Sequence, residues 1–124
     1  MANATIELKH RSKQFAIRLI RLFRSLPRTD EARIIGKQLL RSGTSVAANY
    51  RAVCRARSRA EFIAKIGVVV EEADETVFWL ELLADGGIIK AETLAGLLKE
   101  ANELLAIFAA SQRTARSKSS PSTQ

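Results

Sequence analysis

Positively charged side chains recur at helical spacing in two segments of the first half of the chain. Neighbouring cations fall three or four positions apart, which places them on one face of a helix. Most are arginine, whose planar guanidinium donates paired hydrogen bonds to phosphate oxygens. We therefore predict contact with RNA or DNA phosphates. The candidate residues are Arg18, Arg21, Arg33, Lys37, Arg41, Arg51, Arg55, Arg57 and Arg59.

Charge is divided unevenly along the 124 residues, whose formal net charge is +7. Residues 1–70 carry fifteen Lys or Arg and four Asp or Glu, whereas residues 71–110 carry two and nine. The cationic part suits a polyanion, and the anionic part suits a cationic neighbour, including another copy of the chain. A second interpretation stays open, in which the basic face is plain solvated surface that acids of the same molecule partly neutralise.

The acidic residues of the second half could form a metal site. They are Glu71, Glu72, Asp74, Glu75, Glu81 and Asp85. Di-metal sites in helical bundles use inward-facing Glu-x-x-His units, and the chain has one histidine, His10. We therefore expect no metal and no cofactor. We expect instead that these acids pair with arginines, within one subunit or between subunits.

The hydroxyl and thiol groups do not form a catalytic set. Thr44, Ser45 and Asn49 lie close together in the sequence, but no base accompanies them, because His10 is far away. We assign them to helix packing, with hydroxyls bonded to carbonyls one turn back and the amide bridging two helices. Cys54 is the single cysteine and is assigned to packing as well. No catalytic residue is predicted, and the expectation is a protein that is not an enzyme.

Four segments have the periodicity of amphipathic helices. Pro27 ends the first, Thr29 caps the second, and Ser58 with Glu61 forms a capping box for the third, which ends at Gly86. Their approximate ranges are 9–26, 30–57, 58–86 and 91–112. Because the connections are short, we predict an all-α fold, an antiparallel up-down-up-down four-helix bundle.

The third segment is apolar over more of its circumference than one buried stripe requires, which indicates burial on two sides and a subunit interface. Residues 1–110 are expected to form one bundle domain, and the Ser- and Arg-rich residues 111–124 a disordered basic tail. The sequence has no long apolar stretch and no signal-peptide pattern, so we expect a cytoplasmic protein without membrane contact.

The centre of the chain resembles a known family. The carrying residues are Arg41, Thr44, Ser45 and Asn49, followed by the run Arg57-Ser58 and Glu61-Phe62. Over about residues 8–110 the chain is similar to the bacterial four-helix-bundle family that is also called the 23S rRNA intervening-sequence protein family. Thr44, Ser45, Asn49, Ser58 and Glu61 form the packing signature of this resemblance.

The resemblance implies an antiparallel four-helix bundle that assembles into a ring-like homopentamer and has no assigned enzymatic activity. Many members are encoded within insertions in 23S rRNA genes. Related accessory proteins of diversity-generating retroelements form similar pentamers that bind nucleic acid and a reverse transcriptase. This chain departs from the family pattern after Asn49, where Arg51, Ala52 and Val53 replace Ala-Glu-Gly. The change removes an acid and adds a cation.

Two functions remain open from the sequence. In the first, a self-assembling bundle binds RNA or DNA through its basic surface, without reading bases, because no base-reading motif is present. In the second, the protein is a scaffold whose basic face docks an acidic protein partner.

Overall fold

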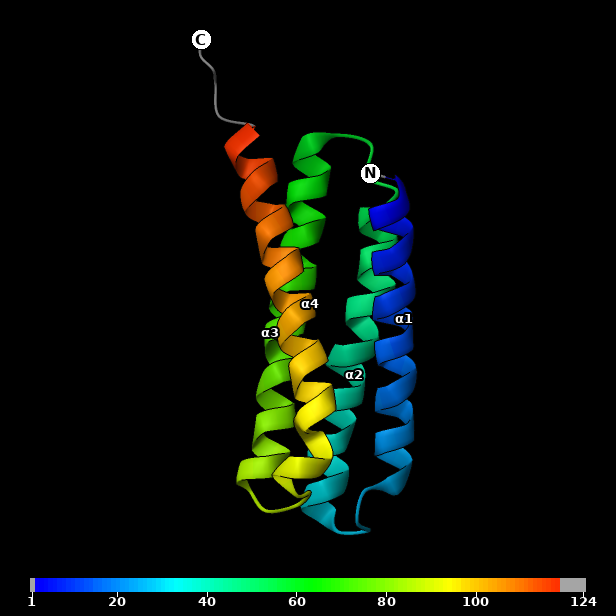
Figure 1. Ribbon diagram of the computed structural model, residues 1–124, viewed down its shortest axis with the longest axis vertical. Coiled ribbons are helices and arrows are strands. Elements are labelled where there is room, and N and C mark those ends of the chain that lie inside the picture. The colour runs from blue at the N-terminus through cyan, green and yellow to red at the C-terminus, as the bar shows by residue number, and fades with distance from the viewer. Residues whose placement is uncertain (1, 119–124) are drawn as a thin grey trace.

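The computed structural model describes residues 2–118, and these form four α-helices joined by short connections. The helices are α1 (Ala2–Ser25), α2 (Asp30–Val53), α3 (Arg59–Asp85) and α4 (Ala91–Lys118). The chain reverses direction at each connection, so that every helix runs antiparallel to the one before it (Figure 1). This confirms the predicted all-α four-helix bundle.

Side-chain caps lie at the starts of α2 and α3. The Thr29 hydroxyl accepts a hydrogen bond from the backbone N–H of Ala32 at 3.2 Å, at the start of α2. The Ser58 hydroxyl accepts one from the N–H of Glu61 at 3.0 Å, at the start of α3. The carboxylate of Glu61 reaches back one residue further than a capping box requires, to the N–H of Arg57 at 2.8 Å. Both caps satisfy N–H groups that have no partner within their helix.

Three helix ends differ by several residues from the predicted ranges, namely the start of α1 and the ends of α2 and α4. Helix α1 begins at Ala2 rather than Lys9, because the apolar side chain of Leu8 packs on the core and extends the inner stripe. Helix α2 ends at Val53, not Arg57. The N–H of Ala56 bonds to the carbonyl of Val53, a turn that reverses the chain before α3 begins.

The predicted disordered tail began too early. Helix α4 continues to Lys118, so residues 111–118 are helical, and residues 119–124 lie outside the described part. Two observations explain the longer helix. Ser111 and Gln112 are half-buried and so belong to the bundle. The cations Arg116 and Lys118 lie in the last turn, where the helix dipole favours positive charge.

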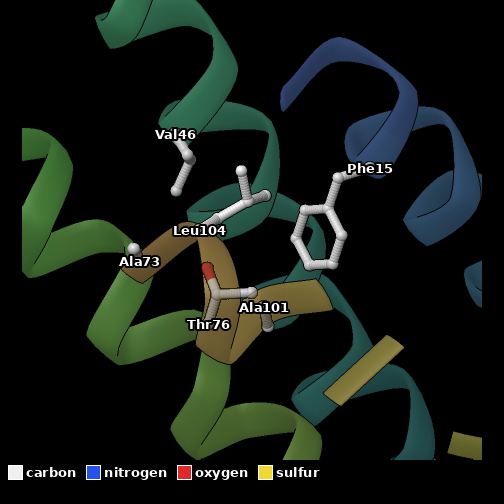
Figure 2. Close-up of a pocket in the computed structure, with 6 residues that line it drawn as sticks. All are labelled: Phe15, Val46, Ala73, Thr76, Ala101 and Leu104. Carbon is white, nitrogen blue, oxygen red and sulfur yellow. The ribbon is translucent and has the colours of Figure 1, made fainter. Parts of the chain in front are cut away.

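The core is filled by large apolar side chains alternating with small ones. In its middle layer, Phe15 of α1 and Leu104 of α4 line one small space between the helices, together with Ala73 and Ala101 (Figure 2). The space between these side chains is too small to hold a water molecule. The interior of this layer therefore offers no ligand cavity, and function has to be sought on the surface.

Helix α2 packs closely against both of its neighbours. The hydroxyl oxygens of Ser42 in α2 and Thr76 in α3 are 2.9 Å apart, and both residues are buried. The next residue, Gly43, contacts the fully buried side chain of Leu19 from α1. A Cβ atom at residue 43 would overlap Leu19 Cδ1. Glycine is therefore required at residue 43 for the approach of α1, not for backbone conformation.

We expect Gly43→Ala to destabilise the protein by about 1–3 kcal/mol, because Leu19 cannot leave its buried site without opening the core. The matched control is Gly67→Ala in α3, where the new Cβ meets only the flexible end of Gln112 at 3.1 Å. There the better helix propensity of alanine stabilises the fold by up to about 1 kcal/mol. Urea unfolding measures both variants, and equal stabilities would contradict the packing role of Gly43.

Candidate nucleic-acid interface

The predicted cations of α2 divide into paired and unpaired groups. Arg41 extends across to α3, where its guanidinium bonds to Glu75 and lies 3.3 Å from the carboxylate of Glu72. Trp79 donates its indole N–H to the same Glu75 carboxylate at 3.0 Å. These two donors, Trp79 first, lower the pKa of Glu75. Arg41 is therefore held in an intramolecular network, as the second interpretation of the basic face expected.

The other predicted cations in and just after α2 form no ion pair with the described residues of α3. Arg33 pairs with Asp30 on its own helix at 2.8 Å, and both side chains are well exposed. Lys37, Arg51 and Arg55 are exposed and form no ion pair with any described residue. The helical period places Lys37 and Arg51 on one stripe with Arg33, the α2 stripe, and Arg55 follows it in the turn after Val53, whereas Arg41 is rotated toward α3. The stripe remains cationic without Arg41.

On α1, the predicted Arg18 faces α4 rather than α2. Its guanidinium lies beside Gly96 of α4, and its charge contributes to lowering the pKa of Glu100. Arg11, about two turns earlier in α1, bonds to Glu100 at 2.7 Å and to Glu103 at 3.0 Å. Arg21 is exposed. The structure therefore does not bring Arg18 together with the α2 stripe.

Two further predicted arginines, Arg57 and Arg59, lie at one end of the bundle, close to Arg55 in the chain. Arg57 is exposed, and the Arg59 guanidinium donates to the carbonyl oxygen of Lys118 at 2.5 Å. The connection between α2 and α3 thus meets the carboxyl end of α4, at the end of the bundle where α1 begins (Figure 1). Arg113 and Arg116 of the α4 extension bring further positive charge to this end. Sequence analysis had assigned them to a disordered tail.

Three cationic or titratable residues of α1 were missed. Lys9, His10 and Lys13 line a groove between α1 and α2, and Arg51 lines its other side. The spacing of Lys9 and Lys13, four residues apart, was visible in the sequence. The position of Arg51 opposite them was not visible in the sequence. It depends on the antiparallel pairing that sets the first half of α1 beside the second half of α2 (Figure 1).

The packing signature is bonded within its own elements. The Thr44 hydroxyl donates to the carbonyl of Leu40, one turn back, at 2.7 Å. The Asn49 amide donates to the carbonyl and hydroxyl oxygens of Ser45, at 2.9 and 2.7 Å. Asn49 was predicted to bridge two helices, and these bonds keep it on α2. The amide reaches its own helix because residue 45 lies directly below it on the same face.

Within residues 2–118, no group of three or more His, Cys, Asp or Glu side chains is placed to hold a metal ion. None of the described helices combines the length and the apolar character that a membrane span needs.

Fold and surface together define a class, a four-helix bundle with unpaired cations on α1 and α2 and with neutralised cations facing α3 and α4. The model of one protein family, the 23S rRNA-intervening sequence protein, matches residues 4–110. The chain therefore belongs to the 23S rRNA-intervening sequence protein family.

A solved structure agrees with this assignment. A protein of unknown function from the S23 ribosomal protein family of Bacteroides thetaiotaomicron is 35% identical and superimposes with a TM-score of 0.78. The match covers 85% of this chain and 97% of the other. No curated protein matches the sequence.

The ion pairs between helices predict a loss of stability in acid. Hydrogen bonding by Arg11 lowers the pKa of Glu100 below its usual value of 4.5, so the ionised carboxylate stabilises the fold at neutral pH. This contribution disappears as the pH falls through the lowered pKa. We expect Glu100→Gln to cost about 1 kcal/mol near neutral pH, discounted for partial exposure.

The difference between Glu100→Gln and the unmodified protein should close in strong acid, where both side chains are neutral. Urea unfolding as a function of pH measures it. The matched control is Glu71→Gln, which removes an exposed carboxylate that forms no ion pair within residues 2–118. A gap for Glu100→Gln that does not depend on pH would contradict the role of the ion pair.

Proposed function

We propose that this protein is a non-enzymatic, self-assembling cytoplasmic bundle that binds RNA or DNA phosphates through the cations of α1 and α2. One observation carries the proposal. Among the predicted cations of α2, the acids of α3 neutralise only Arg41, and Lys37, Arg51 and Arg55 remain exposed without an ion pair in the described part. Side chains that are unpaired in the folded protein are available to phosphates at no cost in broken ion pairs.

The proposed mechanism is electrostatic. Lysine and arginine side chains contact phosphate oxygens and release condensed counterions, so that affinity falls steeply as salt rises. The α2 stripe presents Lys37 and Arg51 on exposed turns of the helix, and Arg55 follows directly after its end. Its intervening Thr44, Ala47 and Ala48 offer neither an aromatic ring nor an amide for reading base edges. Binding would therefore be independent of sequence.

The α2 stripe gives the first binding test. We expect the triple variant Lys37→Gln, Arg51→Gln, Arg55→Gln to bind structured RNA at least tenfold more weakly at low salt. The slope of log affinity against log salt should shrink by about 2–3, near one unit for each lost phosphate contact. Fluorescence anisotropy at several salt concentrations measures both quantities.

The control for this test removes the same charge outside the α2 stripe. It is the triple variant Arg24→Gln, Arg28→Gln, Lys90→Gln, whose residues are exposed near the α1–α2 and α3–α4 connections. It should bind RNA within about twofold of the unmodified protein if contacts are local. Equal losses in the two variants would mean that net charge alone governs binding. Retained RNA affinity in the first variant would favour the alternative, a face that docks an acidic protein.

Self-assembly is supported by apolar side chains on the outer face of α3. Phe78 is 51% exposed and Val68 is 42% exposed, and the Phe78 ring packs edge-on against Trp79. A large apolar group at such exposure beside another, as Phe78 lies beside Trp79, is consistent with an association surface. The family resemblance implies a homopentamer, and we adopt that as the proposed state.

Light scattering should give a mass several times the 13.7 kDa of one chain. Phe78→Ser should shift the mass toward that of the monomer at micromolar concentration, because it removes apolar area from the proposed interface. Circular dichroism of the variant checks that the helices persist. A monomeric unmodified protein would contradict self-assembly, and an unchanged mass for Phe78→Ser would exclude this residue from the interface.

A further inference from the structure

A groove runs between the first half of α1 and the second half of α2, with a volume of about 480 Å³. Residues of both helices line it. The lining residues are Lys9, His10 and Lys13 from α1, and Thr44, Ala47, Ala48 and Arg51 from α2. Except for Arg51, none of the side chains that line it was among the predicted phosphate contacts.

The charge of the groove has one sign. Lys9, Lys13 and Arg51 contribute cations, His10 adds an imidazole, and no carboxylate lines the groove. None of these three cations forms an ion pair with a described residue, whereas Arg11 and Arg41 on the neighbouring faces are both neutralised by glutamates. A concave surface lined by one sign of charge concentrates its potential and attracts counter-ions. The groove is therefore suited to an anion.

The floor of the groove selects the kind of anion. Thr44, Ala47 and Ala48 are small, so an extended chain can approach the backbone of α2 closely. The Thr44 hydroxyl already donates to Leu40. No aromatic side chain lines the groove, so bases find no stacking platform there. Contact would be made through the charged backbone of the ligand and not through its bases.

The spacing of the cations indicates a repeated charge rather than a single ion. Lys9 and Lys13 are one helical turn apart, about 6 Å along α1, and Arg51 faces them from α2. All three side chains are exposed, so a lone inorganic anion would stay hydrated and gain little. A polymer with regularly spaced phosphates gains from each contact through counterion release.

We propose that this groove binds the sugar–phosphate backbone of a single nucleic-acid strand, with Lys9, His10 and Lys13 on one side and Arg51 on the other. The proposal rests on the proposed function and names the place where one strand lies. It also predicts which residues of α1 take part, namely those of its first half rather than Arg18.

Two variants test the charge and the shape of the groove separately. Lys9→Gln with Lys13→Gln removes two cations from one wall. Ala48→Leu keeps every charge but fills the floor, at an exposed helical position where leucine is tolerated. The matched control is Arg24→Gln with Arg28→Gln, which removes the same charge far from the groove.

The probe is a fluorescein-labelled oligothymidine strand of twenty nucleotides, and the readout is anisotropy with the full chain. We expect the Lys9 and Lys13 double variant to bind at least fivefold more weakly, with a salt slope smaller by about 1.4, as two single-strand contacts require. Ala48→Leu should bind at least threefold more weakly with an unchanged slope. The control should bind within twofold.

The outcomes separate this inference from the proposed function. If the unmodified protein binds neither the strand nor structured RNA, both are overturned, and if it binds structured RNA but not the strand, only the groove is overturned. If it binds the strand, and the groove variants bind equally well while the Lys37, Arg51 and Arg55 variant is impaired, only the groove is overturned. A loss in the lysine variant without any loss in Ala48→Leu would also overturn it, because charge would then act without the groove. Competition by poly-glutamate at equal charge would overturn the preference for phosphates.

Discussion

The close packing of α2 against its two neighbours sets the arrangement of everything else on the surface. Ser42 is pressed against Thr76 of α3, and Gly43 receives Leu19 of α1, so two adjacent residues fix the rotation of α2 about its axis. With that face buried, the helical period leaves Lys37 and Arg51 pointing outward, and Arg55 is exposed in the turn that follows. A different rotation of α2 would turn cations toward the core, which carries a high free-energy cost. The small residues of the core therefore decide where the charges lie.

The seams between helices differ in charge because most of the acids lie in the second half of the sequence. Arg41 meets Glu72 and Glu75 across the α2–α3 seam, and Arg11 meets Glu100 across the α1–α4 seam. Each of those seams includes one helix from the acidic half of the chain. The α1–α2 seam combines the two basic helices, so no acid is present along its groove. The unpaired groove is thus a direct consequence of chain order and antiparallel pairing.

The fold was largely predictable from the sequence, and the site only in part. The caps at Thr29 and Ser58 are local features, and the structure places both as predicted. The facing of a surface cation depends on which helices are neighbours, and periodicity on one helix does not contain that information. Arg18 was therefore grouped with α2 although it faces α4, and Lys9 and Lys13 were missed beside α2. The end of α2 at Val53 likewise depends on where α3 must begin.

The distribution of unpaired acids bears on how assembly and ligand binding would coexist. Glu71, Asp74, Glu81 and Asp85 of α3 are exposed and form no ion pair with described residues, near the exposed ring of Phe78. If copies joined by placing this acidic face on the α1–α2 groove, assembly and nucleic acid would compete for the same cations. In the proposed homopentamer, an interface centred on the apolar side chains of α3 would leave the groove open instead and would repeat it once per subunit. Repetition of that kind multiplies weak phosphate contacts, since one polyanion can then occupy several grooves together.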